Sequence, residues 1–204
     1  MSDDLLPAGL RICVLGDALV AGIGDNKGLG WTGRVAARTT PGPGGLAMFP
    51  LGIPGDGTPQ LLARCRNEAW LRYDRAADNR LVLAPGTGDL DQGVSLARSR
   101  LNLANLLDDA RADEVSCLVV GPPPTTDRQG NERVGDLSAA YADVCERRDI
   151  GFVDCHTPLV GHEQWYADLA SGDGRHPGQV GYGLVAWLVL HNGWHAWLGL
   201  PGAQ

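Results

Sequence analysis

Three Gly-Asp pairs and one late histidine motif are the parts of this chain best suited to chemistry. The pairs are Gly16-Asp17, Gly55-Asp56 and Gly88-Asp89, and the motif is Asp173-Gly-Arg-His176-Pro177. A histidine can accept a proton at neutral pH, and a carboxylate three residues earlier can orient its ring. Glycine-containing turns can offer backbone N–H groups to an oxygen that becomes negatively charged. This combination suits acyl transfer, which needs a nucleophile as well.

Short apolar runs alternate with helix-length segments along the whole chain. We expect strands at 11–15, 46–51, 80–84, 116–120 and 151–154, and helices at 31–39, 59–73, 96–110, 134–148 and 178–198. The last helix could be broken near Asn192-Gly193. The alternation predicts an α/β fold: a doubly wound, five-stranded parallel sheet in the flavodoxin-like order 2-1-3-4-5, with helices on both faces.

The Gly-Asp pairs follow the first three expected strands. In doubly wound sheets, ligands bind in the crevice beyond the carboxyl ends of the strands. The pairs should therefore meet at one site.

Length and composition indicate a single globular domain spanning 1–204. The chain has 204 residues, of which 44% are hydrophobic and 20% charged, and a formal net charge of −7. The negative charge argues against nucleic acid or an anionic membrane as a partner. The acidic start does not resemble a signal peptide, and the apolar run at 12–15 is too short to span a membrane. We therefore expect no stable membrane insertion and a cytoplasmic location.

Cysteines and histidines give no sign of a metal site. The five cysteines are odd in number and lie apart, which is typical of buried, reduced thiols. His191 and His195 share one helical face, but no acidic residue completes a zinc site there. We expect neither a metal nor an organic cofactor.

The four polar segments together resemble the SGNH, or GDSL-type, hydrolases, a family of esterases, lipases and thioesterases. Gly16-Asp17-Ala18-Leu19 corresponds to the family's Gly-Asp-Ser-Leu block, and Gly55 to its oxyanion glycine. Gly86-Thr-Gly88-Asp89 corresponds to Gly-x-Asn-Asp, and Asp173 to Pro177 fits the fourth block fully. The order and spacing agree from Ile12 to the final helix.

The resemblance implies a role for each site residue. His176 would be the base, Asp173 its orienting carboxylate, and position 18 the nucleophile. The backbone N–H groups of residues 18 and 55 would form the oxyanion hole, with a side-chain amide at position 88 as a further donor.

Two residues depart from the family pattern. Ala18 has no hydroxyl, so it cannot attack a carbonyl carbon. Gly88 lacks the amide, and one such donor is typically worth about 10²–10³ in rate. An engineered Ser-to-Ala change and natural divergence both explain Ala18, and the second departure favours divergence.

Three functions stay open at this stage. The first is an ester or thioester hydrolase whose nucleophile is missing in this chain. The second is a non-catalytic relative that binds a small acyl ligand or a protein partner. The third is an assembly subunit, because the Trp-rich C-terminus could pair with another chain and form an oligomer. We expect Ala18→Ser to create esterase activity, and Gly88→Asn to improve it further.

Overall fold

Five parallel strands form one sheet in the order β2-β1-β3-β4-β5. The computed structural model describes residues 9–201, apart from the side chains of residues 128 and 129. The strands are β1 (Leu10–Gly16), β2 (Leu46–Gly52), β3 (Asp78–Ala84), β4 (Ser116–Val120) and β5 (Gly151–Val153). The predicted fold class and strand order are both confirmed.

The register of the sheet brings the polar turns to one edge. Gly16 at the end of β1 pairs with Gly52 of β2 and Ala84 of β3, so three strands end at the same level. Pro50, which cannot donate a ladder hydrogen bond, lies in the edge strand β2 and is exposed. The turns that follow these strands therefore start side by side.

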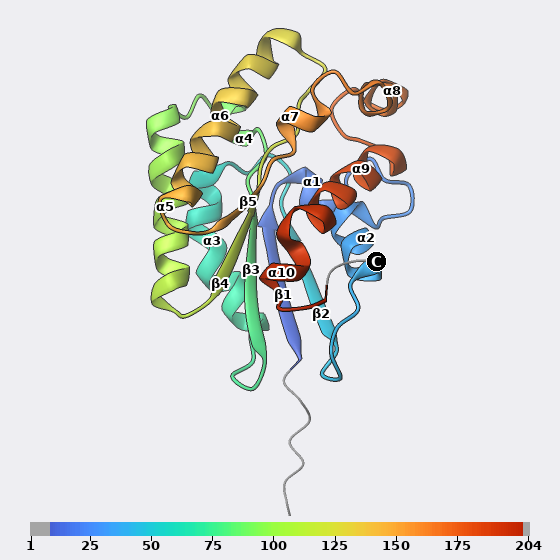
Figure 1. Cartoon of the computed structure of the whole chain (residues 1–204). Coiled ribbons are helices and arrows are strands. Elements are labelled where there is room, and N and C mark those ends of the chain that lie inside the picture. The colour runs from blue at the N-terminus through green and yellow to red at the C-terminus, as the bar shows by residue number, and fades with distance from the viewer. Residues whose placement is uncertain (1–8, 202–204) are drawn as a thin grey trace, which may run out of the picture.

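Helices cover both faces of the sheet (Figure 1). On one face, α2 (Gly30–Arg38) and α9 (Gln179–Val189) pack together over a core that includes Val14 and Val82. On the other face, α3 (Thr58–Ala69), α5 (Leu96–Ala112) and α6 (Arg128–Glu146) cover Cys13 and Leu15. Alternate residues of β1 thus enter opposite cores, as the pleat of a strand requires.

Four shorter helices lie toward the carboxyl ends of the strands, at the top of Figure 1. They are α1 (Ala18–Ala21), α4 (Gly88–Asp91), α7 (His156–Leu159) and α8 (Glu163–Ser171). Three of them have four residues, which is too short for a helical hydrophobic period to appear in the sequence. Sequence reasoning predicted none of the four.

Three expected helices differ in detail from the structure. Helix α6 begins at Arg128, not 134, because its first six residues include no aliphatic or aromatic side chain to reveal the period. Helix α3 ends at Ala69 and a 3₁₀ turn (Trp70–Arg72) follows. The closing helix leaves helical geometry at Asn192 and Gly193, within a turn at Leu190–Trp194 before α10 (His195–Trp197), which confirms the expected break. Within residues 9–201, no helix has the length and apolar character to cross a membrane.

Candidate active site

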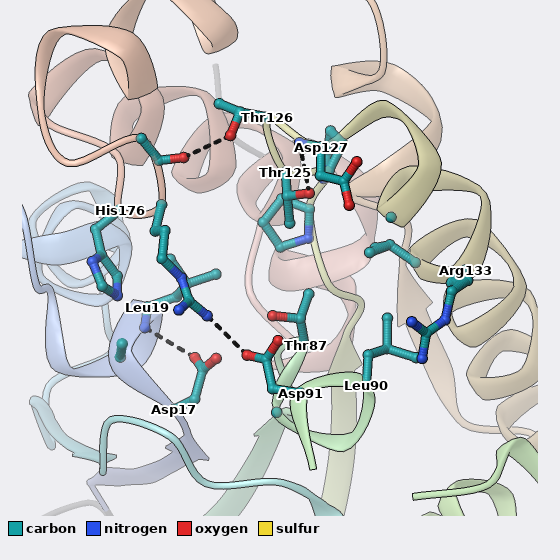
Figure 2. A pocket seen from close by; sticks show the side chains of 18 of the residues that line it. Asp17, Leu19, Thr87, Leu90, Asp91, Thr125, Thr126, Asp127, Arg133 and His176 are labelled. Carbon is teal, nitrogen blue, oxygen red and sulfur yellow. Dashed lines mark hydrogen bonds and ion pairs between the residues drawn. The ribbon is translucent and has the colours of Figure 1, made fainter. Parts of the chain in front are cut away.

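A cavity of about 310 Å³ opens beyond the carboxyl ends of the strands (Figure 2). Ala18, Gly55, Gly88 and His176, four of the five residues predicted from the sequence, line it. The fifth, Asp173, lies behind His176 and binds its ring. Segments that are far apart in the chain therefore meet at one site, as the order of the motifs predicts. We call this space the outer cavity.

His176 and Asp173 form a tight pair. The Nδ1 atom of His176 lies 2.6 Å from Oδ2 of Asp173. The other carboxylate oxygen accepts hydrogen bonds from the backbone N–H groups of His176 at 2.8 Å and Arg175 at 2.9 Å. These bonds, above all that from the His176 N–H, hold the pKa of Asp173 well below its usual range. With Nδ1 paired to a carboxylate, Nε2 is the ring nitrogen left to accept a proton.

The turn between β1 and α1 places Ala18 at the cavity. Asp17 caps α1, because its Oδ1 accepts the backbone N–H of Leu19 at 2.9 Å. Ala18 is the first residue of this helix and is 6% exposed. Figure 2 shows Asp17, Leu19 and His176 on the same side of the cavity, across from Leu90 and Arg133.

Three backbone N–H groups at the cavity have no hydrogen-bond acceptor among residues 9–201. They belong to Ala18, Gly55 and Gly88. Ala18 and Gly88 each begin a short helix, where the first N–H groups have no partner within the helix. Gly55 has a φ of +86°, a conformation that favours glycine. Unpaired N–H groups at one cavity are the donors that an anionic oxygen needs.

Gly88 leaves no room for a side chain. A Cβ atom at this position would lie 2.2 Å from the carbonyl oxygen of Asp56 and 3.0 Å from the nitrogen of Gly57. Both are backbone atoms, so an asparagine at 88 would require the turn after β2 to move. Gly88→Asn would therefore change the position of this turn as well as adding an amide, which the sequence alone does not reveal.

A buried carboxylate joins the turns that contain Gly55 and Gly88. Asp89 is 1% exposed and accepts hydrogen bonds from the N–H and the hydroxyl of Thr58, at 2.6 and 2.7 Å. The hydroxyl of Tyr141 donates to it at 3.2 Å, and Asn102 donates to the Thr58 hydroxyl at 3.0 Å. The neighbouring sequence does not reveal this role of Asp89, because its partners lie on the distant helices α3 and α6.

Arg64 fixes the same turn from the other side. Its Nε atom pairs with Asp56 at 2.6 Å, and Nη2 donates to the carbonyls of Gly16 at 2.8 Å and Leu51 at 2.9 Å. One guanidinium thus binds the ends of both β1 and β2. Sequence reasoning missed this residue, since an arginine on an amphipathic helix looks like any solvated side chain.

Asp17 is itself buried beside the cavity. A Cβ atom on Gly86 would lie 1.8 Å from Oδ2 of Asp17, so the carboxyl group occupies the space that a side chain at 86 would need. Burial raises the pKa of Asp17 to about 6, although the nearby charge of His176 lowers it in part. Asp17 therefore caps helix α1 from a buried place that disfavours the charged form of its carboxyl group.

Part of the wall of the outer cavity is apolar. Trp165, Pro123 and Pro124 contribute to it, and the Trp165 indole N–H donates to the Pro124 carbonyl at 3.0 Å. Arg175 pairs with Asp91 at 2.8 Å, as Figure 2 shows by the dashed line to Asp91.

Among the described residues, no group of three or more His, Cys, Asp or Glu side chains could hold a metal ion.

The fold is that of a doubly wound α/β protein with a cavity at the carboxyl ends of its strands. The chain belongs to the GDSL-like lipase/acylhydrolase family, whose model matches residues 14–184. A comparison with curated proteins gives no match.

Solved structures share the fold over nearly the whole chain. A lipase/acylhydrolase from Enterococcus faecalis is 22% identical, with a TM-score of 0.73 over 95% of this chain and 98% of that one. A catalytic mutant of Axe2, an acetylxylan esterase from Geobacillus stearothermophilus, is 17% identical, with a TM-score of 0.74 over 97% and 96%. A G-D-S-L family protein from Veillonella parvula is 19% identical, with a TM-score of 0.68 over 90% and 97%.

Proposed function

We propose that the outer cavity is the active site of a GDSL-type ester or thioester hydrolase whose nucleophile is missing in this chain. The observation that carries the proposal is the 2.6 Å pair between His176 and Asp173 at the cavity that Ala18 lines. This is the base and its orienting group, next to the position where a hydroxyl would stand. The substrate is a small acyl ester or thioester.

A serine at position 18 would complete the reaction. Its hydroxyl oxygen attacks the carbonyl carbon while Nε2 of His176 takes the proton, and the imidazolium then protonates the leaving group. The N–H groups of residues 18, 55 and 88 stabilise the negative charge on the carbonyl oxygen. Gly88 thus acts through its backbone, in place of the side-chain amide.

Natural divergence accounts for Ala18 better than an engineered change does. The turn after β2 packs against Gly88 so closely that no side chain fits there. A designed Ser-to-Ala change would not have reshaped this second position. Both departures from the family pattern therefore belong to one altered site.

A second candidate function is binding without catalysis. Three N–H groups without acceptors among residues 9–201 suit a carboxylate, which is the acid product of ester hydrolysis. In this alternative the chain holds a small acyl ligand in the cavity and leaves it unchanged.

The deciding experiment is Ala18→Ser, assayed with p-nitrophenyl acetate. Hydrolysis that appears in the variant and is lost again in Ala18→Ser/His176→Gln supports the hydrolase site. A variant that folds as the parent does but gains no activity contradicts it. Retained binding of acetate by the parent would then favour the second candidate.

We also propose a cytoplasmic location. All five cysteines are free and buried, which suits a reducing compartment.

A further inference from the structure

A second, smaller cavity of about 20 Å³ adjoins the outer cavity. Leu19 and Pro123 line both spaces, so the two meet at these side chains. We call the smaller space the inner cavity. It lies beneath α1, between the ends of β3 and β4 and the start of α9, where Ala84, Val120 and Val185 contribute to its wall.

The inner cavity is lined by apolar side chains apart from one tyrosine. Trp31 is 2% exposed and Tyr182 is fully buried. The hydroxyl of Tyr182 already donates to the carbonyl of Ile23 at 2.7 Å, so its polar end is satisfied. A water needs about 10–15 Å³ and several polar partners, and apolar cavities stay dry. A space of this size and lining suits a methyl or ethyl group better than a water.

The inner cavity borders the outer cavity at Leu19 and Pro123, and its wall also includes Pro177, the residue after His176. The acyl chain of an ester held at the N–H groups of residues 18 and 55 would enter the inner cavity past Leu19 and Pro123. The leaving group then has the larger outer cavity.

From this arrangement we infer that the inner cavity is the acyl-chain site and that it selects acetyl- and propionyl-sized groups. The inference rests on the proposed function and adds the class of substrate. The limit on chain length is the volume of the inner cavity, about 20 Å³, and Ala84, Gly86 and Gly121 form part of its wall. Longer chains would have to displace Leu19 or remain in the outer cavity.

The test uses Ala18→Ser with p-nitrophenyl acetate, butyrate and hexanoate. We expect kcat/KM for acetate to exceed that for hexanoate by about tenfold or more, since each misfitting methylene typically changes the rate by that factor. Adding Leu19→Ala joins the two cavities and should move the preference to butyrate or hexanoate. Adding Ala84→Val fills the inner cavity and should lower kcat/KM for acetate. Leu71→Ala, at an exposed leucine that lines neither cavity, is the matched control and should leave the acetate-to-hexanoate ratio as it is.

Carboxylate binding by the unmodified chain provides a readout that needs no catalysis. Acetate should bind more tightly than hexanoate, measured by chemical-shift titration, and Leu19→Ala should reverse this order. Active Ala18→Ser with equal rates for all chain lengths would overturn the acyl site but not the hydrolase. Inactive Ala18→Ser with size-selective binding would overturn the hydrolase but not the acyl site. No activity and no binding would overturn both.

Discussion

The carboxylate of Asp89 accepts hydrogen bonds from both the backbone N–H and the hydroxyl of Thr58, at 2.6 and 2.7 Å. Asp89 follows β3 and Thr58 begins α3, so this contact holds together the two turns that contain Gly88 and Gly55. The N–H groups proposed to bind an oxyanion depend on these turns. Their geometry is therefore set by a buried side chain that does not itself line the cavity.

Asp89→Ala should destabilise the fold by about 3–5 kcal/mol, the range for removing one partner from a buried charged network. Two donors of Thr58 would lose their acceptor inside the core. Asp89→Asn keeps one acceptor oxygen and should lose less. The free energy of unfolding from urea titrations measures both. Asp91→Asn, in an exposed pair with Arg175, is the control and should change stability by less than about 1 kcal/mol. Equal losses for Asp89→Ala and Asp91→Asn would contradict the structural role of Asp89.

Gly88→Ala should also be destabilising, because its methyl group would lie 2.2 Å from the Asp56 carbonyl oxygen. Overpacking of this kind typically costs about 1–3 kcal/mol. Gly183→Ala is a matched control: it lies within α9 with open space around it, so alanine there should stabilise by about 0.5–1 kcal/mol. Thermal unfolding of the two variants distinguishes them. If Gly88→Ala were as stable as the parent, the close packing at this position would be wrong.

The buried carboxyl group of Asp17 should make the folded protein less stable as the pH rises. Its pKa is about 6 in the folded chain against an ordinary value of 3.8, so the folded state favours the protonated form. The contribution is fully present below pH 3.8 and is lost as the pH rises through 6. Two pKa units correspond to about 3 kcal/mol. Asp17→Asn stays neutral and keeps an acceptor for the Leu19 N–H, so it should match the parent at pH 4 and be more stable at pH 8. Parallel stability curves for the two proteins across this range would argue against a buried, titrating Asp17.

Asp173→Asn, placed in the Ala18→Ser background, should lower kcat by up to about 10⁴, the loss known for an orienting aspartate in serine hydrolases. The amide cannot favour the tautomer of His176 in which Nε2 is free. Because Asp173 is more than half exposed, thermal stability should change little. Kinetics with p-nitrophenyl acetate and a melting curve check the two expectations. An unaltered kcat would mean that His176 needs no orienting group.

The sequence predicted the parts of the fold that have a clear period. Strands β1 and β3 stand out as apolar runs that end at Gly16 or just before Pro85, and helix α5 stands out by its regular apolar spacing. The residues lining the candidate site were also found, since the Gly-Asp pairs end neighbouring parallel strands. The short helices α1 and α4 were not found, because four residues show no period.

The side chains that hold the turns of the site in place could not be predicted either. Arg64 reaches one carbonyl oxygen on each of two strands and the carboxylate of Asp56 in the turn after β2. Asp89 reaches Thr58 and Tyr141. All these contacts depend on how the helices pack. Nothing in the neighbouring sequence marks these residues. The close approach of Gly88 to Asp56 is likewise a property of two turns meeting in space, so the sequence does not show that a side chain at position 88 would displace the turn after β2.

The five cysteines have a practical consequence. All are buried, and burial raises the pKa of Cys13 to about 11 and of Cys65, Cys117 and Cys145 to about 12. Thiolates are the reactive form, so alkylating reagents should leave the folded chain unlabelled at neutral pH. A single cysteine introduced at position 18 would lie at the cavity that His176 also lines. A spectroscopic probe could then be attached selectively to this cysteine, with no need to replace any of the five native cysteines.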